Sequence, residues 1–359
     1  VARVAAFPRI RTRRAVKDAA RTLGEKEAGR KLLEEAEPGA TVSDLLAEPD
    51  LSPDQKEVLQ LASAIEGAPA GQGVSDGTVV IAGEPIQDLV PVRPAADGGL
   101  PVICLSAEDV QSLGFLKMDF QGLPVLERTA NTLQLAQAHS PHEVPPAQVI
   151  ADSAGNASDP YVCAAWDLLA EGDTSGVFLM SNPENVRYAR RAAPKTLDDL
   201  AALTALNRPG FTDAAILQEY LADKEGISAC ARYTQDAGEQ AVLHGLLGRT
   251  RGLIIFQEQI IMLCQKLAGA DGEDADRWRL ALQRDDPAEL AGVRAEFLAG
   301  ARDTLRPRTA LKVYESMVRA GPSAFSASHA HAQARLTFVD AWLAANHPEH
   351  FRAAHTAGI

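Results

Sequence analysis

The stretch that decides the fold of this chain is Gly114-Phe115-Leu116-Lys117-Met118-Asp119-Phe120-Gln121-Gly122-Leu123. Side chains alternate between the two faces of a strand, so Lys117 and Asp119 are expected on one face and the apolar residues between and beside them on the other. A carboxylate that binds a metal ion, next to an ammonium that binds phosphate, is the combination that nucleotidyl transfer requires. Half-buried strands with one charged face show the same alternation, so this pattern alone leaves a purely structural role open.

The composition is that of a globular protein with room for two or three hydrophobic cores. The chain has 359 residues, of which 46% are hydrophobic. Its apolar runs, such as 253–256, are far shorter than the roughly 20 residues that a membrane span needs, and we expect no secretory leader at its start. We therefore expect a cytoplasmic protein without a membrane partner.

The cysteines form neither a metal-binding nor a disulfide pattern. They lie far apart, without a Cys-x-x-Cys pair, at Cys104, Cys163, Cys230 and Cys264. We expect no zinc site and no disulfide framework, and we interpret the four residues as thiols in a reducing compartment.

Charge is distributed unevenly along the chain. The net charge of −13 argues against a protein that binds nucleic acid through its overall charge. Residues 1–31, however, hold ten Lys and Arg against three Asp and Glu, while residues 41–180 hold four against 20. The basic segment can contact phosphate groups. A solvated helical face, or a contact with an acidic surface elsewhere in the protein, is the alternative interpretation.

The first part of the chain is expected to be helical. Residues 13–33 combine helix formers with helical apolar spacing, and we expect Gly24 and Gly29 to break this helix. Thr41 and Ser52 are typical helix N-caps, the second followed by proline at the first helical position.

A glycine-rich break at 67–77 separates this helical part from a strand-rich part. Short runs of β-branched residues bounded by Gly, Pro and Asp occupy 78–82, 89–92 and 100–104. With Lys117 to Asp119 they predict a small mixed sheet.

From Leu123 onward the pattern becomes helical, apart from a loop at 139–146 that contains proline and histidine. Candidate helices, each bounded by Gly, Pro or Asp, are 183–191, 196–206, 212–223, 256–267, 273–282, 287–302, 309–320 and 327–346. The expected fold class is α+β and predominantly helical.

Several segments follow one another in an order that is typical of one protein family. They are residues 14–24, 65–92, 116–123, 172–178, 194–213, 256–269 and 324–351. In this order they resemble the bacterial C-family DNA polymerases, of which the alpha subunit of DNA polymerase III is the representative. The resemblance covers nearly the whole chain. It implies template-directed DNA synthesis by two-metal nucleotidyl transfer, with Mg²⁺ as cofactor and a DNA primer-template, deoxynucleoside triphosphates and other replication subunits as partners.

The resemblance also implies a division into regions. Residues 1–77 correspond to a thumb-like helical region, 78–122 to the second half of a nucleotidyltransferase-like palm, and 123–359 to the fingers. The first palm half, with a pair of catalytic aspartates, is expected before residue 1. The clamp-binding and single-strand-binding regions are expected after residue 359.

Site residues follow from the same resemblance. Asp119 matches the third catalytic aspartate, a metal ligand, and Lys117 is expected to offset charge on the triphosphate. Arg208 and His329 match positions that bind the incoming nucleotide. The alternatives are that Arg208 caps backbone carbonyls and that His329 is a structural hydrogen-bonding residue. The run 257–259, Gln-Glu-Gln, is expected to order a fingers helix.

The basic segment supplies the expected DNA contacts, namely Arg11, Arg13, Arg14 and Lys17. Other positions depart from the family pattern: residues 179–182 replace a Gln-Leu-Glu-Ser run, Ala327 stands for a lysine and Ser75 for a histidine. Each change removes a polar or cationic group that would face DNA or nucleotide.

Two interpretations therefore remain. In the first, the chain is part of an active polymerase whose other catalytic aspartates lie on sequence outside it. In the second, it is a degenerate, non-catalytic paralogue that acts as a DNA-binding or assembly module. Under both, the chain alone lacks two of three catalytic aspartates and is expected to be inactive.

Overall fold

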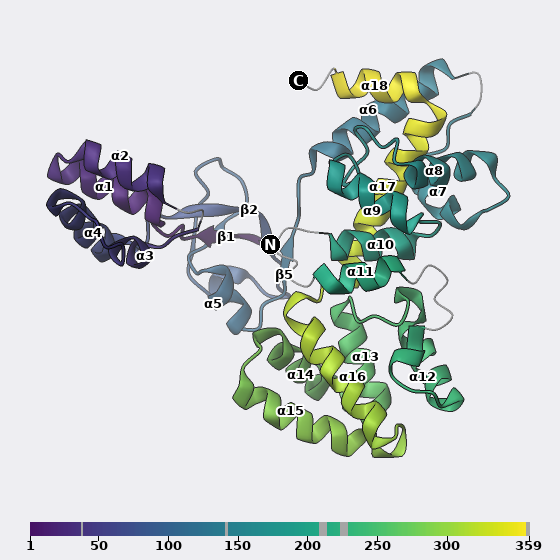
Figure 1. Cartoon of the computed structure of the whole chain (residues 1–359). Helices are drawn as coiled ribbons and strands as arrows, with labels where there is room; N and C mark the ends of the chain where they lie inside the picture. Colours follow the sequence, from purple (N-terminus) through teal and green to yellow (C-terminus); the bar gives the residue numbers. More distant parts are fainter. Residues whose placement is uncertain (37–38, 141–142, 208–213, 223–228, 357–359) are drawn as a thin grey trace. The chain divides into compact units, whose positions relative to one another are not determined.

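The computed structural model describes all residues except 37–38, 141–142, 208–213, 223–228 and 357–359. The chain divides into two compact units, Val1–Gly122 and Leu123–Ile359 (Figure 1). Most described residues are helical, and the strands are confined to the first unit. No described helix is long and apolar enough to cross a membrane.

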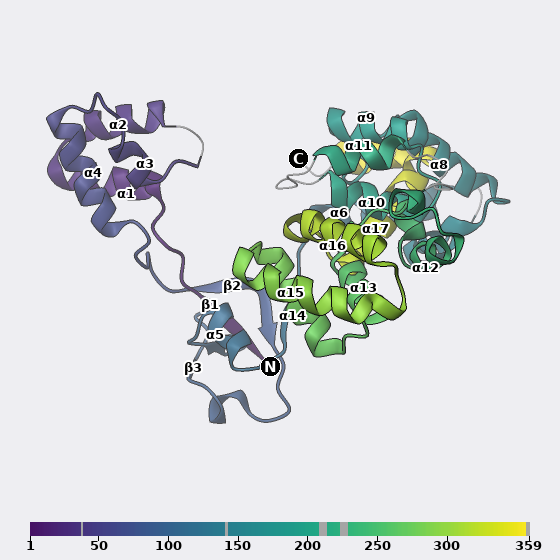
Figure 2. The same cartoon turned by 60° about the horizontal axis from the view of Figure 1, so that its bottom comes forward.

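Four helices of the first unit pack around one hydrophobic cluster that includes Val16, Leu32 and Leu59. They are α1 (Thr12–Leu23), α2 (Lys26–Glu35), α3 (Val42–Leu46) and α4 (Pro53–Ile65). Figures 1 and 2 show α1, α2 and α4 side by side. The expected N-caps are confirmed, because Thr41 and Ser52 each form a capping box.

The two glycines expected to break the first helix behave differently. Gly24 has φ +83° and ends α1, as a left-handed C-cap residue does. The expected break at Gly29 is wrong, because Gly29 lies inside α2. A Cβ atom there would lie 2.5 Å from the Cβ of Ala20, so this glycine allows α2 to approach α1 closely.

The sheet of the first unit has five strands in the order β3-β4-β1-β2-β5. They are β1 (Ala2–Ala6), β2 (Gly73–Val80), β3 (Val92–Arg93), β4 (Val102–Ile103) and β5 (Lys117–Asp119). β1 pairs in parallel with β4, while the other neighbours are antiparallel, so the sheet is mixed as expected. β1 was not predicted, although it lies in the middle of the sheet. The short helix α5 (Ala107–Ser112) precedes β5.

The described part of the second unit contains helices and no strand, apart from an isolated parallel bridge between Phe256 and Phe325. Its helices are α6 (Pro124–His139), α7 (Ala147–Asp152), α8 (Pro160–Glu171), α9 (Pro183–Ala192), α10 (Leu197–Leu206), α11 (Ala214–Ala222), α12 (Ala237–Leu247), α13 (Gln257–Ala268), α14 (Gly272–Arg284), α15 (Pro287–Gly300), α16 (Pro307–Ala320), α17 (Ala327–Asn346) and α18 (Pro348–Thr356). Each of the eight predicted ranges contains a helix, and the bounds agree to within a few residues, except that residues 212, 213 and 223 of the range 212–223 lie outside the described residues. The predicted ranges did not include α6, α7, α8, α12 or α18.

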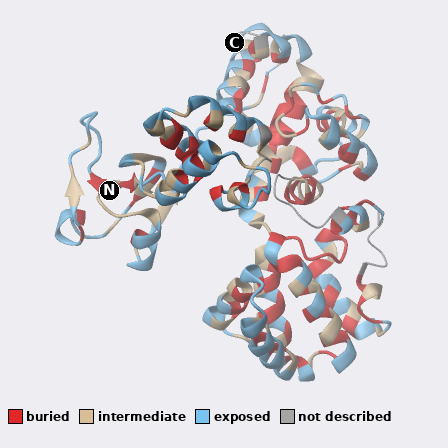
Figure 3. Cartoon of the chain, turned by 60° about the vertical axis from the view of Figure 1, so that its left-hand side comes forward, coloured by how far each residue is buried: buried red, intermediate tan, exposed pale blue. Residues whose placement is uncertain are grey.

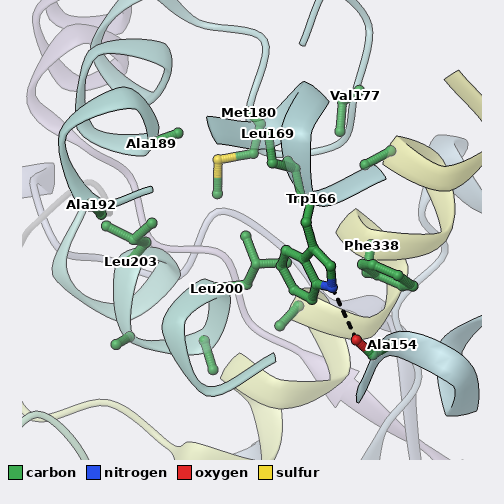
Figure 4. Packing of buried hydrophobic residues seen from close by; sticks show 14 of the residues in the cluster. Ala154, Trp166, Leu169, Val177, Met180, Ala189, Ala192, Leu200, Leu203 and Phe338 are labelled. Atoms are coloured by element: carbon green, nitrogen blue, oxygen red, sulfur yellow. Dashed lines mark hydrogen bonds between the residues drawn. The ribbon is translucent and has the colours of Figure 1, made fainter. Parts of the chain in front are cut away.

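Two hydrophobic clusters hold this unit together. In the first, α17 packs against α8 and α10, and the ring centroids of Trp166 and Phe338 lie 4.7 Å apart (Figure 4). Trp166 donates a hydrogen bond of 2.9 Å to the carbonyl oxygen of Ala154. The second cluster surrounds Phe297 and Trp278. Buried residues accordingly gather on the inner faces of the helices and exposed ones on the outer faces (Figure 3).

Candidate functional site

Lys117 and Asp119 do share one face of β5, the edge strand of the sheet. The Nζ atom of Lys117 lies 3.0 Å from Oδ2 of Asp119. The Oδ1 atom of Asp119 accepts a hydrogen bond of 2.7 Å from the hydroxyl of Thr78 on the neighbouring strand β2. That hydroxyl in turn accepts a hydrogen bond of 2.8 Å from Ser75.

An irregularity of strand β2 at Gly77 brings these side chains together. Gly77 has φ +75°, and its carbonyl accepts a hydrogen bond of 2.7 Å from the backbone N–H of Phe120. A Cβ atom at this position would lie only 1.9 Å from the carbonyl oxygen of Phe120. Only glycine therefore lets β2 approach β5 closely enough to place Thr78 opposite Asp119.

The electrostatics favour an ionised carboxylate at this site. Hydrogen bonds from Thr78 and Lys117 lower the pKa of Asp119 below its usual value. The Asp119 side chain is 50% exposed, so an ion or ligand from solvent can reach it. Lys117 neutralises its charge in the present arrangement, and a bound cation would compete with this ammonium for the carboxylate.

A magnesium site needs more ligands than Asp119 supplies. Mg²⁺ prefers an octahedral set of oxygen ligands. Among the residues that the structure describes, no group of three or more His, Cys, Asp or Glu side chains is placed to hold a metal ion. The residues present therefore do not by themselves form the expected Mg²⁺ site.

The predicted DNA contacts lie on one exposed face at the start of α1. Arg11, Arg13, Arg14 and Lys17 are all exposed, while Ala15 and Val16 point into the helical cluster. Arg14 lies 3.5 Å from Asp18, whereas Arg11, Arg13 and Lys17 form no ion pair with any residue that the structure describes. This face remains available to bind an anion.

In the second unit, a cavity of about 480 Å³ lies beside α9, α10 and α17. Apolar and amide side chains line it: Leu179, Met180, Ser181, Asn182, Asn185, Tyr188, Leu203, Thr204, Asn207, Phe325 and Gln333. A volume of this size is typical of small-molecule sites. The α9–α10 pocket, as we call this cavity, thus combines an apolar wall with several amide groups that can hydrogen-bond a ligand.

The two predicted nucleotide-binding residues relate differently to the α9–α10 pocket. Arg208 lies outside the described residues, although Asn207, which precedes it, lines the pocket. His329 lies in the first turn of α17 and packs edge-on against Phe325, with ring centroids 5.3 Å apart. Phe325 belongs to the pocket wall, so His329 supports the wall instead of lining it.

Residues 257–259, expected to order a fingers helix, form hydrogen bonds near the starts of α13 and α17. The carboxylate of Glu258 accepts a bond of 2.8 Å from the backbone N–H of Ala327, at the start of α17. The side chain of Gln259 accepts bonds from the backbone N–H groups of Ile255 and Phe256. Glu258 thus fixes the start of α17, and Gln259 fixes the residues that lead into α13.

Sequence reasoning missed Asp340, which is only 1% exposed in the middle of α17. Its carboxylate accepts a hydrogen bond of 2.7 Å from the Thr129 hydroxyl and one of 3.1 Å from the backbone N–H of Phe178. The signal in the sequence was a single acidic residue within the apolar run 338–343. Buried carboxylates are rare unless they are hydrogen-bonded, so such a residue points to a specific contact.

Two family models match this chain. The model of the bacterial DNA polymerase III alpha NTPase domain matches residues 1–122, and that of the bacterial DNA polymerase III alpha subunit finger domain matches residues 153–304. The error-prone DNA polymerase of Corynebacterium efficiens is 30% identical over 355 residues, which are 98% of this chain and 30% of that protein. The DNA polymerase III subunit alpha of Escherichia coli K12 is 27% identical over 367 residues, which are 99% of this chain and 31% of that protein.

A third relative, the DNA polymerase III subunit alpha of Halalkalibacterium halodurans, is 29% identical over 309 residues, covering 86% of this chain and 26% of that protein. This chain therefore spans less than a third of the length of these relatives.

Proposed function

Because the chain belongs to the family of bacterial DNA polymerase III alpha subunits, we propose that it is part of a DNA polymerase active site in which Asp119 is the third catalytic carboxylate. In this proposal residues 1–77 form a thumb, 78–122 the second half of the palm and 123–359 the fingers. The observation that carries it is the arrangement of Asp119 and Lys117 on the edge strand β5 opposite Thr78 on its neighbour β2.

Each group at this site has a proposed task. Asp119 would supply one ligand to a Mg²⁺ ion, and no described group of three or more His, Cys, Asp or Glu side chains completes such a site. Bound Mg²⁺ would steady the triphosphate and the primer hydroxyl during nucleotidyl transfer. Lys117 would contact a phosphate oxygen of the substrate, and Thr78, which donates to Asp119, keeps the carboxylate oriented.

The α9–α10 pocket is the proposed site for a deoxynucleoside triphosphate. Its volume, about 480 Å³, suits a nucleoside, and Asn182, Asn185, Asn207 and Gln333 offer amide donors and acceptors. Arg208, next in sequence to the pocket residue Asn207, is proposed to contact the triphosphate. His329 packs edge-on against Phe325 and so helps to hold this residue in the pocket wall.

A second function is considered because the described residues contain no group of three or more His, Cys, Asp or Glu side chains that could hold a metal ion. In this alternative the chain binds DNA or organises a replication assembly without catalysing synthesis. The departures from the family pattern at residues 179–182 and Ser75 point in the same direction.

A chimera distinguishes the two functions. We would replace the matched stretch of the Escherichia coli alpha subunit with residues 1–359 and measure primer extension with Mg²⁺ and deoxynucleotides. Extension by the chimera is expected to fall by at least about 100-fold in Asp119→Ala, because a metal-binding carboxylate is removed. The matched control is Asp88→Ala, an exposed carboxylate in the same unit, which should retain activity.

The chain alone is the second arm of this experiment, and no incorporation is expected from it. A folded chimera that binds primer-template but does not extend it would contradict a catalytic role and support the non-catalytic alternative. Extension by the isolated chain that depends on Asp119 would contradict the proposal that its site is incomplete.

A further inference from the structure

A second cavity of the helical unit lies among α6, α7, α8, α17 and α18, which Figure 1 shows together. Its volume is about 610 Å³, and it shares no lining residue with the α9–α10 pocket. Five aromatic rings belong to its lining, namely those of His139, Tyr161, Trp342, His347 and His350. We call it the ring-lined cavity. Its size is that of a site for a small organic molecule.

The rings of this cavity form a continuous series of contacts. The ring centroids of Tyr161 and Trp342 lie 6.0 Å apart, and those of Trp342 and His347 lie 5.5 Å apart. The rings of His347 and His350 are 6.1 Å apart, and His350 stacks on His139 at 5.8 Å. Aromatic side chains attract the faces and edges of other flat rings. The cavity therefore favours a flat aromatic molecule.

The charges around the cavity favour a neutral occupant. Among the described residues, no group of three His, Cys, Asp or Glu side chains is placed to hold a metal ion. Burial, and to a smaller extent the charge of His350, lower the pKa of His347, which favours its neutral form. Glu143 and Asp159 are among the lining residues that the structure describes, whereas no Lys or Arg is. This distribution disfavours an anion such as a nucleoside triphosphate.

Trp342 has a hydrogen-bond donor that the protein does not use. Its side chain is only 5% exposed, and buried indole N–H groups usually have an acceptor. Nε1 of Trp166 donates to the carbonyl oxygen of Ala154, and Nε1 of Trp278 donates to the carboxylate of Glu296. No described residue accepts a hydrogen bond from Nε1 of Trp342, and this atom is not sealed in the interior. It is therefore open to an acceptor in the cavity.

Asn346, one helical turn further along α17, has an acceptor that the protein does not use. Its Nδ2 atom lies 3.0 Å from the carbonyl oxygen of Tyr161 and 2.9 Å from that of Trp342. Carbonyl oxygens only accept, so these contacts fix the orientation of the amide and use both of its N–H groups. Oδ1 accepts from no described residue. Residues four positions apart share one face of a helix, so this acceptor and the Trp342 donor are neighbours.

We propose that the ring-lined cavity binds a small, neutral, planar nitrogen heterocycle. A ring nitrogen of this ligand accepts a hydrogen bond from Nε1 of Trp342, and a ring N–H group donates one to Oδ1 of Asn346. The aromatic side chains pack against the ligand. The two nitrogens of an imidazole-type ring point in diverging directions, which suits side chains that lie roughly 5–6 Å apart, one helical turn along α17. The site does not depend on the function proposed for the α9–α10 pocket.

Three probes of nearly the same shape test the two hydrogen bonds. Benzimidazole has both a ring acceptor and an N–H donor, indole lacks the acceptor, and N-methylbenzimidazole lacks the donor. Ligand-observed NMR titrations of the whole chain at pH 8 measure the dissociation constants. We expect benzimidazole to bind at least about fivefold more tightly than either of the other probes, which is the effect of one typical hydrogen bond.

Two variants assign each hydrogen bond to its side chain. Trp342→Phe keeps a ring but removes the N–H group, so the preference for benzimidazole over indole should disappear. Asn346→Ala removes the acceptor, so the preference over N-methylbenzimidazole should disappear while the preference over indole remains. Tyr161→Ala, at a ring that is 47% exposed, is the control. It should weaken all three probes by a similar factor, about twofold to tenfold, and keep both preferences.

The indole N–H signals of the protein give a direct measurement in the wild type. Benzimidazole should shift the signal of Trp342, which is identified by its absence in Trp342→Phe. The signals of Trp166 and Trp278 should stay in place, because their N–H groups are already bonded, and they report whether a variant is folded. If Trp342→Phe does not fold, the wild-type shift and the ratios between the probes decide the question.

Three results would overturn the proposal. The first is equal affinity of the wild type for benzimidazole and indole, or no binding of benzimidazole. The second is a Trp342 signal that does not shift when benzimidazole is bound. The third is a preference for benzimidazole over indole that survives in a folded Trp342→Phe variant.

Discussion

Asp340 makes the stability of the protein depend on pH with a defined sign. Its pKa in the folded protein is about 6, above the usual value near 3.8 expected when the chain unfolds. The stabilising effect of its proton is therefore complete below the unfolded pKa and is lost as the pH rises through 6. The difference between the folded and the unfolded pKa corresponds to a change of up to about 3 kcal/mol in the free energy of unfolding.

The variant Asp340→Asn removes this dependence. We predict that its free energy of unfolding, relative to the wild type, rises by up to about 3 kcal/mol between pH 4 and pH 8. Urea denaturation at several pH values measures this difference, with Asp173→Asn as the control. If the difference in free energy of unfolding between Asp340→Asn and the wild type stays constant from pH 4 to pH 8, the conclusion that burial raises the pKa of Asp340 is wrong.

Single residues were predictable from sequence when their partners were local. Lys117 and Asp119 are two positions apart in a strand, and alternation alone places them together. Asp340 meets Thr129 and Phe178, which lie 211 and 162 positions away, and no periodicity encodes such contacts. Only the chemical cost of a carboxylate in an apolar run pointed to it.

At the scale of elements, the pairing of β2 with β5 depends on Gly77. We predict that Gly77→Ala displaces β5, because the new Cβ would overlap the carbonyl oxygen of Phe120 and the positive φ would add strain of about 1–3 kcal/mol. Hydrogen exchange of the Phe120 amide, which bonds to Gly77, should accelerate strongly. Gly83→Ala is the control, since no atom lies within 4 Å of the position that its Cβ would take. Unchanged exchange in Gly77→Ala would contradict this role.

Elements were predictable to the extent that their signals are local. Ser52 and Pro53 begin α4 as expected, because a cap bonds within its own first turn. β1 was missed because it is defined by pairing with β2 and β4, about 70 and 100 residues further along the chain. Gly29 was misinterpreted because its role is to allow packing against Ala20, which helix propensity does not report.

At the scale of the whole molecule, basic and acidic residues are concentrated in different parts of the chain. Each hydrophobic cluster, in contrast, is formed by residues of a single unit. The four hydrophobic clusters each lie within one unit, and the basic segment 1–31 includes the exposed face of α1. The net charge of −13 would repel DNA, so binding depends on where the cations are exposed. The sequence established this charge separation, but only the structure identified which cations have no carboxylate partner among the described residues.

DNA binding should therefore depend on the unpaired cations of α1. We predict that replacing Arg11, Arg13 and Lys17 with alanine weakens primer-template binding and reduces the slope of log affinity against log salt by about 0.9 for each phosphate group that the variant no longer neutralises. The control is Arg30→Ala on α2, whose guanidinium is already paired with Glu27 and Glu34. Fluorescence anisotropy across a range of salt concentrations measures both quantities. If the triple variant matches the wild type in affinity and slope, α1 does not bind DNA, whereas equal losses in the triple variant and Arg30→Ala would indicate a nonspecific effect of net charge.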